Sequence, residues 1–407
     1  MYCGPCGSAR SGRLRVIRGP CEPAARASAV APFHVMRILE RAKAREAAGH
    51  DVIHMEVGEP DFPTPDPILE AAQEALGSHA MGYTPAAGLP QLRAAIADYY
   101  RQRYGTDLDP ERVIVTPGGS GALLLALAAV VDVSQVVLTT DPGYPCNRHM
   151  VSLLGGVPRS VPVLAEQNYR LTLGAVSAHW EPNVRAVMVA SPANPTGTVL
   201  SREDIAELRA FAQARDAALI VDEIYQGLTY GVADHSAVAS GDENVFVVNS
   251  FSKYFCMTGW RLGWLVAPAR FIGTLTRLAQ NLFLAAPTLA QYAALVAFLP
   301  DTLKILNRRR DQLRERRDTL VEALGLLGFA IPMHPEGAFY VYARIPERER
   351  NSSALAERLL EDADVAVTPG LDFGIQQADR MLRFAYTTES ARLMEAARRI
   401  ESVIGRA

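Results

Sequence analysis

The sequence lacks the long apolar runs and the one-sided charge that would each place it in a special class of protein. Its longest apolar run, residues 122–131, is about half of the roughly 20 residues that a helix needs to span a bilayer. The 41 basic and 44 acidic residues give a net charge of −3, so charge gives no reason to expect a nucleic acid or an anionic membrane as partner. With 407 residues, 49% of them hydrophobic, the chain is long enough for a globular enzyme of two domains.

Cysteine and histidine are also scarce. The chain has five cysteines and eight scattered histidines, and outside the first 30 residues we find no disulfide framework and no zinc-spaced pair, so no metal site is expected. His54 and His149 are expected to be structural. This cysteine usage fits a reducing cytoplasm, which is the location that we expect. Internal repeats and low-complexity tracts are absent from the sequence as well.

Residues 1–30 differ from the rest of the chain in composition. They hold five arginines, three of the cysteines and a single acid, Glu22. Cys3 and Cys6 form a C-x-x-C pair, which could be a redox pair or half of a zinc site, and the arginines also fit a transit peptide. No second ligand pair follows, and glycines and prolines interrupt any amphipathic helix. We therefore expect residues 1–30 to be a disordered extension, or a product of a start codon placed too far upstream.

The segment that follows a short apolar strand at 245–248 carries candidate chemistry. Ser250 and Ser252 surround Lys253, and Arg261 lies eight residues further on. A lysine just past a buried strand is poorly solvated, which lowers its pKa and lets the neutral amine form an imine with a carbonyl. The hydroxyl and guanidinium groups are donors suited to a phosphate. Together they suggest pyridoxal 5′-phosphate (PLP), although a surface Ser-Lys turn with a salt-bridging arginine would give the same short pattern.

A second anion site is expected at residues 116–121, Thr-Pro-Gly-Gly-Ser-Gly. This glycine-rich turn precedes an apolar helix that should begin at Ala122. Free backbone N–H groups and the positive end of a helix make a cradle for an anion. We interpret Gly119, Ser120 and Gly121 as the phosphate donors, and a bare strand-to-helix turn is the alternative.

From residue 112 onward the expected strands and helices alternate, which predicts an α/β fold with a mostly parallel sheet. The strands are expected at 113–115, 136–140, 184–190, 217–221 and 245–248. The strand at 217–221 ends directly on Asp222. Such an aspartate is either a satisfied cap or an ionised functional group, and ligands of α/β sheets bind at this edge.

The C-terminal part changes in pattern. A long amphipathic helix is expected at 301–327, with the basic run RRRDQLRERR (308–317) exposed as a solvated face because acids interrupt it. Beyond it the pattern predicts an α+β region. Its strands are expected at 337–342, 365–367 and 381–386, and its helices at 354–360 and 390–404.

The Lys253 segment, S-F-S-K followed by G-W-R-L-G-W, resembles the cofactor-lysine motif of the class I/II aminotransferases, the aspartate aminotransferase-like PLP enzymes of fold type I. Other motifs match this family in its own order, and the resemblance covers about Phe33 to the C-terminus. They are GEPDFPTP (58–65), YTPAAGLPQLR (83–93), TPGGSGAL (116–123), DPGYP (141–145), SPANPTG (191–197), VDEIY (221–225) and MLRFAY (381–386). Each motif alone is weak, but their common register makes the assignment specific.

The resemblance implies roles for single residues. Lys253 would carry PLP and move the substrate's proton, and Asp222 would hold a proton on the pyridine nitrogen. Asn194 and Tyr225 would contact the phenolate oxygen, and Tyr144 would stack on the ring. These roles make Lys253, Asp222 and Tyr225 the candidate catalytic residues.

The resemblance also implies binding roles. The substrate's α-carboxylate would be bound by Gly58, Asn194 and Arg383. Tyr83 would reach the phosphate of the neighbouring subunit, so the resemblance implies a homodimer with shared active sites. The remaining phosphate ligands would be Gly119, Ser120, Gly121, Ser250, Ser252 and Arg261.

For the fold, the resemblance implies a fold-type-I PLP transferase. Its large PLP-binding domain, residues 61–295, would hold a mostly parallel central sheet sandwiched by helices. Residues 31–60 and 296–407 would form the N-terminal and C-terminal parts of a small α+β domain.

The expected function is that of an aminotransferase, which moves an amino group from an amino acid to a 2-oxo acid by a ping-pong reaction through pyridoxamine phosphate. Some aspartate-type relatives carry a lysine where this chain has Ser120, and the segment before Pro287 is apolar. With no obvious cation for a side-chain carboxylate, we expect a neutral apolar or aromatic donor and 2-oxoglutarate as acceptor. A carbon–sulfur β-lyase of the same fold and a non-catalytic PLP-binding effector domain are the alternatives.

Overall fold

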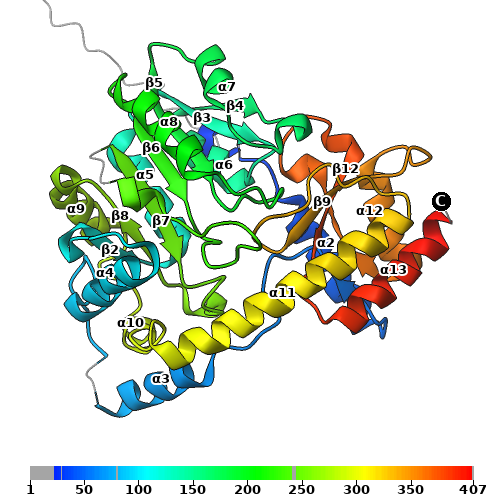
Figure 1. The fold of residues 1–407 in the computed structure, drawn as a ribbon, viewed down its shortest axis with the longest axis horizontal. Coiled ribbons are helices and arrows are strands. Elements are labelled where there is room, and N and C mark those ends of the chain that lie inside the picture. The colour runs from blue at the N-terminus through cyan, green and yellow to red at the C-terminus, as the bar shows by residue number, and fades with distance from the viewer. Residues whose placement is uncertain (1–22, 29, 79–80, 241–243, 406–407) are drawn as a thin grey trace, which may run out of the picture.

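The computed structural model describes residues 23–28, 30–78, 81–240 and 244–405, which form a large and a small domain (Figure 1). Within these residues the large domain is built on a seven-stranded sheet of order β2-β8-β7-β6-β5-β3-β4. Strand β8 runs antiparallel to both of its neighbours, and the other pairs are parallel. The predicted α/β class with a mostly parallel sheet is therefore confirmed. The strands are β2 (Val113–Thr116), β3 (Val136–Asp141), β4 (Val157–Pro162), β5 (Val184–Ala190), β6 (Ala218–Asp222), β7 (Val245–Ser250) and β8 (Gly263–Val266).

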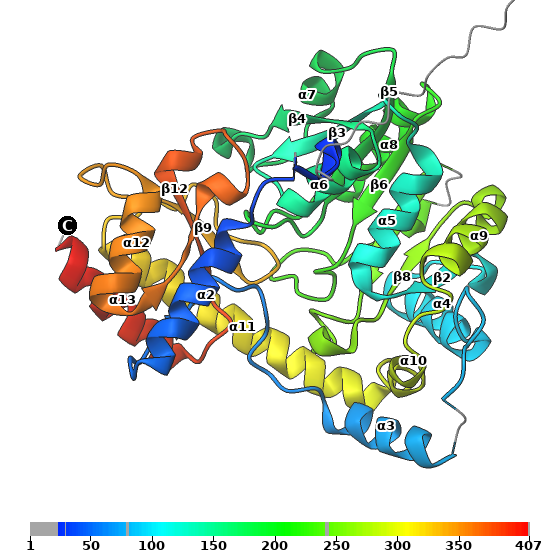
Figure 2. The ribbon, with the colours of Figure 1, turned by 180° about the vertical axis from the view of Figure 1, so that it is seen from behind.

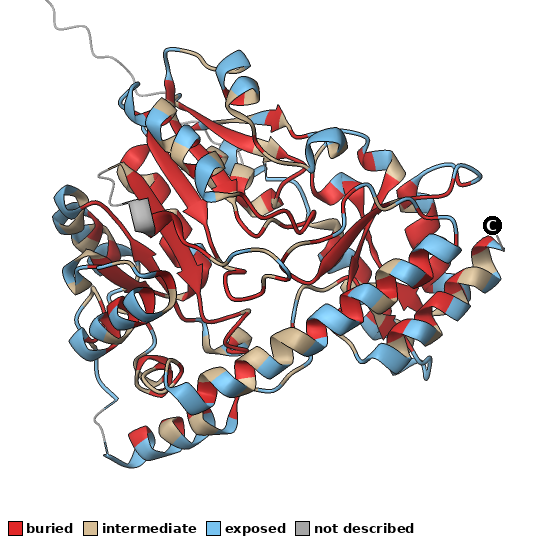
Figure 3. Cartoon of the chain, viewed as in Figure 1, coloured by how far each residue is buried: buried red, intermediate tan, exposed pale blue. Residues whose placement is uncertain are grey.

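Helices cover both faces of this sheet. The central strands β6 and β7 are rich in β-branched residues and are buried along their whole length (Figure 3), as expected for strands covered on two sides. Side chains on one face pack with α5 (Gly118–Val130), α6 (Pro145–Leu153) and α9 (Ile272–Leu282). The opposite face packs with α4 (Pro90–Tyr104), α7 (Leu173–Ala178), α8 (Arg202–Gln213) and α10 (Thr288–Ala294), and α3 (Asp66–Ser78) lies against α10.

The small domain combines segments from both ends of the described chain. Strand β1 (Ile53–His54) pairs with β10 (Val365–Ala366), and a three-stranded sheet joins β11 (Thr368–Pro369), β12 (Met381–Ala385) and β9 (Tyr340–Arg344). Helix α2 (His34–Ala47) lies with α12 (Ser352–Ala363) and α13 (Ser390–Ile404) in this domain (Figure 2). Helix α11 (Pro300–Leu326) runs from α10 to the small domain (Figure 1). The exact domain limits stay a prediction.

Three predicted elements differ in the structure. Helix α5 begins at Gly118 rather than at Ala122, so the glycine-rich segment is the first turn of a helix. The strand expected at 337–342 runs over Tyr340–Arg344, because the N–H of Gly337 bonds to the carbonyl of Gly197 instead. The strand expected at 365–367 is only the two-residue β10, and β11, which begins at Thr368, belongs to a different sheet.

The basic run of α11 is not exposed throughout, as the sequence predicted. Arg316 and Arg317 are each only 7% exposed. Arg316 pairs with Asp61 at 2.8 Å and donates to a backbone carbonyl at 2.7 Å, and Arg317 donates to the carbonyl of Pro335 at 2.7 Å. Asp61 is 255 positions from Arg316, and Pro335 lies beyond the end of α11, so helical spacing alone could not show that both arginines are buried.

Most of the predicted N-terminal extension, residues 1–22 and 29 with Cys3 and Cys6, lies outside the described residues. Residues Ala25–Ser28 form a short helix, α1, that lies against α6, and the predicted disorder of the extension stays a prediction. In the part of the chain that the structure describes, none of the helices has the length and apolar character required to cross a membrane.

Candidate active site

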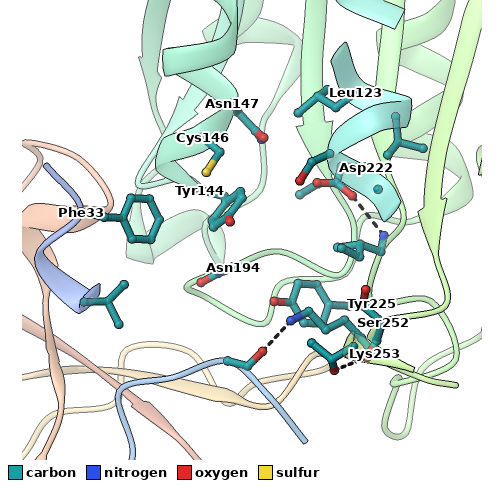
Figure 4. A pocket seen from close by; sticks show the side chains of 18 of the residues that line it. Phe33, Leu123, Tyr144, Cys146, Asn147, Asn194, Asp222, Tyr225, Ser252 and Lys253 are labelled. Carbon is teal, nitrogen blue, oxygen red and sulfur yellow. Dashed lines mark hydrogen bonds between the residues drawn. The ribbon is translucent and has the colours of Figure 1, made fainter. Parts of the chain in front are cut away.

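A cavity of about 260 Å³ lies where the carboxyl ends of β5 and β6 meet the start of α2 and strand β12 (Figure 4). Residues from both domains line it. Among them are most of the residues that the sequence predicted, namely Gly58, Gly119, Ser120, Tyr144, Asn194, Asp222, Tyr225, Ser252, Lys253, Arg261 and Arg383. The fold thus brings together residues that are more than 300 positions apart in the sequence.

Three predicted residues do not line this cavity. Gly121 is the fourth residue of α5, where a backbone N–H already bonds within the helix. The Ser250 hydroxyl is 2.9 Å from Ser252 Oγ and 3.2 Å from the carbonyl of Leu262, so it supports the loop. Tyr83 is 85% exposed on the surface.

Lys253 comes from the loop after β7. Its Nζ donates to the carbonyl of Gly58 at 2.5 Å. Burial lowers the pKa of Lys253 to about 8, and the nearby guanidinium groups of Arg383 and Arg261 act in the same direction. A sizeable fraction of the amine is therefore neutral near physiological pH, which a nucleophile and general base requires.

Asp222 is the last residue of β6, beside Ala190 of β5 and Val248 of β7 in the sheet register. It accepts the N–H of Ile224 at 3.1 Å. Burial raises the pKa of Asp222 to about 6. The carboxylate is charged at neutral pH, and a cation in the cavity would stabilise that charge further.

The start of α5 and Arg261 form an anion cradle. Gly118 has φ of +73°, and a Cβ there would lie 2.8 Å from Nη2 of Arg261, so only glycine lets the guanidinium approach this turn. Arg261 itself has a left-handed φ of 54° and donates to the carbonyl of Thr258 at 3.1 Å. The free N–H groups of the first helical turn, the Ser252 hydroxyl and the guanidinium are a donor set that fits a phosphate.

The guanidinium of Arg383, on β12, has three of its five N–H donors in hydrogen bonds. Its Nη1 donates to Asn194 Oδ1 at 3.0 Å, and its Nη2 donates to the carbonyl of Glu56 and to Thr368 Oγ1. The guanidinium lies 4.3 Å from the ring centroid of Tyr340. Its buried Nε has no partner, and a buried unpaired donor beside a cavity suits an anionic substrate group.

Tyr225 lines the cavity on the side where strand β9 of the small domain lies. Its hydroxyl is 2.8 Å from the hydroxyl of Tyr340. Burial raises the pKa of Tyr225 well above its usual value, so the hydroxyl keeps its proton and can donate a hydrogen bond.

Sequence reasoning missed several residues of the cavity. Asn147, in the first turn of α6, is buried with no partner for its Oδ1, and its place three residues after Tyr144 could have revealed it. Val35 and Met36 reach the cavity from the first turn of α2, and Phe33 reaches it from the position before that helix. No signal in the sequence points to them, because a distant loop of the fold places that helix.

The chain is similar to known proteins over almost its whole length. The family model "Aminotransferase class I and II" matches residues 50–400. A valine–pyruvate aminotransferase of Mycobacterium tuberculosis is 37% identical over 374 residues, 92% of this chain and 96% of that protein. Aromatic-amino-acid aminotransferase 2 of Thermococcus litoralis is 32% identical over 380 residues, which are 92% of this chain and 96% of that protein. The solved structure of the Thermus thermophilus aspartate aminotransferase with maleate matches with a TM-score of 0.89 at 34% identity, covering 94% of this chain and all of that one.

Proposed function

This chain belongs to the class I and II aminotransferases, and from that premise we propose that it moves the amino group of a neutral apolar or aromatic amino acid to a 2-oxo acid such as 2-oxoglutarate. Members of the family depend on PLP. The anion cradle, the buried lysine and the unpaired Asn147 Oδ1 support PLP as the cofactor of this chain. When bound, PLP supplies a carbonyl for the amino group and a ring that withdraws electrons from the substrate carbon.

The residues that hold PLP follow from their chemistry. The first turn of α5, Ser252 and Arg261 bind the phosphate, and Tyr144 packs on the ring. Asn194 accepts from Arg383 through Oδ1, which leaves its N–H groups for the phenolate oxygen, beside the Tyr225 hydroxyl. Asp222 holds a proton at the pyridine nitrogen.

The residues that act on the substrate are Lys253 and Arg383. The Arg383 guanidinium binds the α-carboxylate and so orients the α-carbon in the cavity. The neutral amine of Lys253 takes the proton from that carbon as general base. The resulting ammonium then donates a proton as general acid.

The charged residues of the cavity bear on the choice of amino donor. The cations among its described lining residues are Lys253, Arg261 and Arg383, and each has a role with the cofactor or the α-carboxylate. No cation of the described lining is left for a second carboxylate, whether that of an acidic donor or that of 2-oxoglutarate, so 2-oxoglutarate as acceptor would place its second carboxylate toward solvent or toward the partner subunit. The rest of the wall is largely apolar, with Phe33, Val35, Met36, Leu123 and Met150. This absence of a spare cation is the observation that carries the proposal.

A panel of amino donors with 2-oxoglutarate and with pyruvate tests this proposal. Valine, leucine or phenylalanine should give the highest kcat/KM, and ping-pong kinetics should follow. Aspartate as the best donor by a wide margin would refute the donor class. Pyruvate released from a cysteine-type substrate without any oxo acid would indicate the β-lyase instead.

We also propose a homodimer with shared sites, in the cytoplasm. Both neighbours of Tyr83 are bonded to helix α10. Thr288 donates to the carbonyl of Gly82 at 2.7 Å, and Gln291 donates to Thr84 Oγ1 at 2.8 Å. Tyr83 itself is 85% exposed. A fixed, exposed aromatic residue is suited to contact a second copy of the chain.

A further inference from the structure

Asp372 caps helix α2 from the other end of the chain. Its Oδ1 accepts the N–H of His34 and its Oδ2 the N–H of Val35, each at 2.8 Å, and the residue is 3% exposed. The residue before the helix, Phe33, provides no side-chain cap. The Asp372 carboxylate thus satisfies two free donors of the first turn and places a negative charge at the positive end of the helix.

The capped turn forms one wall of the cavity. Phe33, Val35 and Met36 all line it. The ring of Phe33 lies 6.0 Å from the ring of Tyr144 with the planes at 77°, an edge-to-face contact. Met36 is 49% exposed at the mouth. The position of this wall depends on where the first turn of α2 is held.

The loop after Asp372 is fastened to the large domain. The Asp141 carboxylate, at the end of β3, accepts the N–H of Ile375 at 3.1 Å. The N–H of Gly143 donates to the carbonyl of Phe373 at 2.8 Å. These contacts hold the loop against the turn that leads to Tyr144. Asp372 therefore connects the wall to the expected cofactor side of the cavity.

The same loop supports the proposed carboxylate site. The ring of Phe373, the residue after Asp372, lies 4.8 Å from the Arg383 guanidinium. One loop thus contacts the α2 turn, the β3 end and Arg383. A single carboxylate at its start fixes the apolar wall relative to the group that would bind the substrate's α-carboxylate.

We propose that Asp372 is a positioning residue for the side chain of the amino donor, which it serves by holding Phe33, Val35 and Met36 at the cavity. This inference rests on the proposed function. It assigns donor selectivity to a residue that does not line the cavity. Donors with large apolar side chains depend on the wall, and alanine, whose side chain is a single methyl group, does not.

The test uses the holoenzyme and the variant Asp372→Asn, which keeps the size but removes the charge and one acceptor. The kcat/KM for phenylalanine or leucine should fall about tenfold, mainly through KM, the size expected when an apolar contact is lost. The value for alanine should stay within about twofold, because no wall contact is involved. Hydrogen exchange at residues 34–36 should become faster, and the absorbance of bound PLP should not change.

Asp109→Asn is the matched control, because Asp109 also caps a backbone N–H, that of Glu111 at 2.9 Å, at an exposed place that does not line the cavity. It should change neither the donor ratio nor the exchange at 34–36. Met36→Ala tests the wall without touching the cap and should lower the same donor ratio, even if Asp372→Asn fails to fold.

Two results would overturn the inference: a loss in Asp372→Asn that is equal for alanine and phenylalanine, or unchanged exchange at residues 34–36. A wild-type enzyme that prefers aspartate would instead contradict the proposed donor class. In that case the exchange measurement and the change in the donor ratio still decide the role of Asp372.

Discussion

Arg383 donates to Asn194 across 3.0 Å, and this hydrogen bond joins strand β12 of the small domain to the loop after β5 of the large domain. The bond commits the amide oxygen of Asn194 and orients the guanidinium toward the cavity. A carboxylate bound by Arg383 would therefore add to a contact that already links the two domains. Substrate binding should favour the closed arrangement, because the new contacts exist only when both domains are in place.

Arg383→Lys should weaken substrate binding more than it slows the chemistry. Lysine keeps the charge but loses the fork that reaches Asn194, Thr368 and a carboxylate together. We expect KM to rise about 10- to 100-fold, which corresponds to roughly 1.5–3 kcal/mol for a charged hydrogen bond. Steady-state kinetics with the best donor measure the effect. Arg392→Lys, at an exposed ion pair with Asp51, is the control and should leave KM unchanged.

Lys253→Ala should abolish turnover and covalent labelling together. Wild-type protein treated with PLP and borohydride should yield a peptide with a pyridoxyl group on residue 253, found by mass spectrometry. The variant should yield none and should lose at least about 10²-fold in kcat, the low end for general acid–base catalysis. Lys253→Arg keeps a cation near Gly58 and should fail as well. Retained activity in both variants would contradict the assigned mechanism.

The lowered pKa of Lys253 can be measured without turnover. Below a pH of about 8 the amine is protonated and unreactive, and above it the neutral form dominates. The rate at which cofactor-free protein captures PLP should therefore rise with pH, with a midpoint at about 8. Stopped-flow absorbance follows the capture. A midpoint near the ordinary value of 10.5 would show that burial does not act on Lys253 as described.

The sequence predicted those site residues that are tied to local chain geometry. Lys253 and Asp222 follow buried strands, and strand ends can be recognised from apolar runs followed by small or charged residues. Arg383 was recognised through a motif and not through its surroundings. The structure places all three of these residues at the cavity, as the sequence predicted.

Other features depend on contacts between distant segments, which local patterns do not encode. Arg316 was expected at the surface, but it pairs with Asp61, 255 positions away. Phe33 and Met36 line the cavity beside the helix turn that Asp372 caps, and Asp372 lies 338 positions from His34. The first turn of α5 was expected to be a loop, since its glycines disfavour helix, and the packing of the apolar residues that follow outweighs that preference.

Tyr83→Phe tests whether active sites are shared between subunits. If the Tyr83 hydroxyl binds the cofactor phosphate of the partner subunit, the variant should release PLP more readily, by about tenfold in Kd for one charge-assisted hydrogen bond. Mixed dimers of Tyr83→Phe and Lys253→Ala subunits should then contain one wholly native site. In such mixtures the PLP released on dialysis measures the effect. A monomer by analytical ultracentrifugation would contradict the shared site.

Glu223 follows Asp222 in the sequence. Its titration should make the free energy of unfolding fall as pH rises. Its carboxyl is buried and accepts from the Ser236 hydroxyl at 2.7 Å and from the N–H of Ala237 at 2.7 Å. Burial raises the pKa of Glu223 from 4.5 to about 8. The native state therefore binds this proton more tightly than the unfolded chain does, so its contribution to the free energy of unfolding is complete below about pH 4.5 and is lost between that pH and about 8.

Glu223→Gln removes this titration and can keep both hydrogen bonds, because an amide can accept from Ala237 and donate to Ser236. The difference in Tm between the variant and the wild type should thus grow from pH 5 to pH 9, by at least about 1 °C, the shift that roughly 1 kcal/mol gives in a chain of 407 residues. Calorimetry with PLP in excess at each pH measures it. Glu207→Gln, on the exposed side of α8, should show no such trend. A Tm difference that stays constant with pH would mean that Glu223 is ionised in the native protein, and its charge would then require a compensating partner.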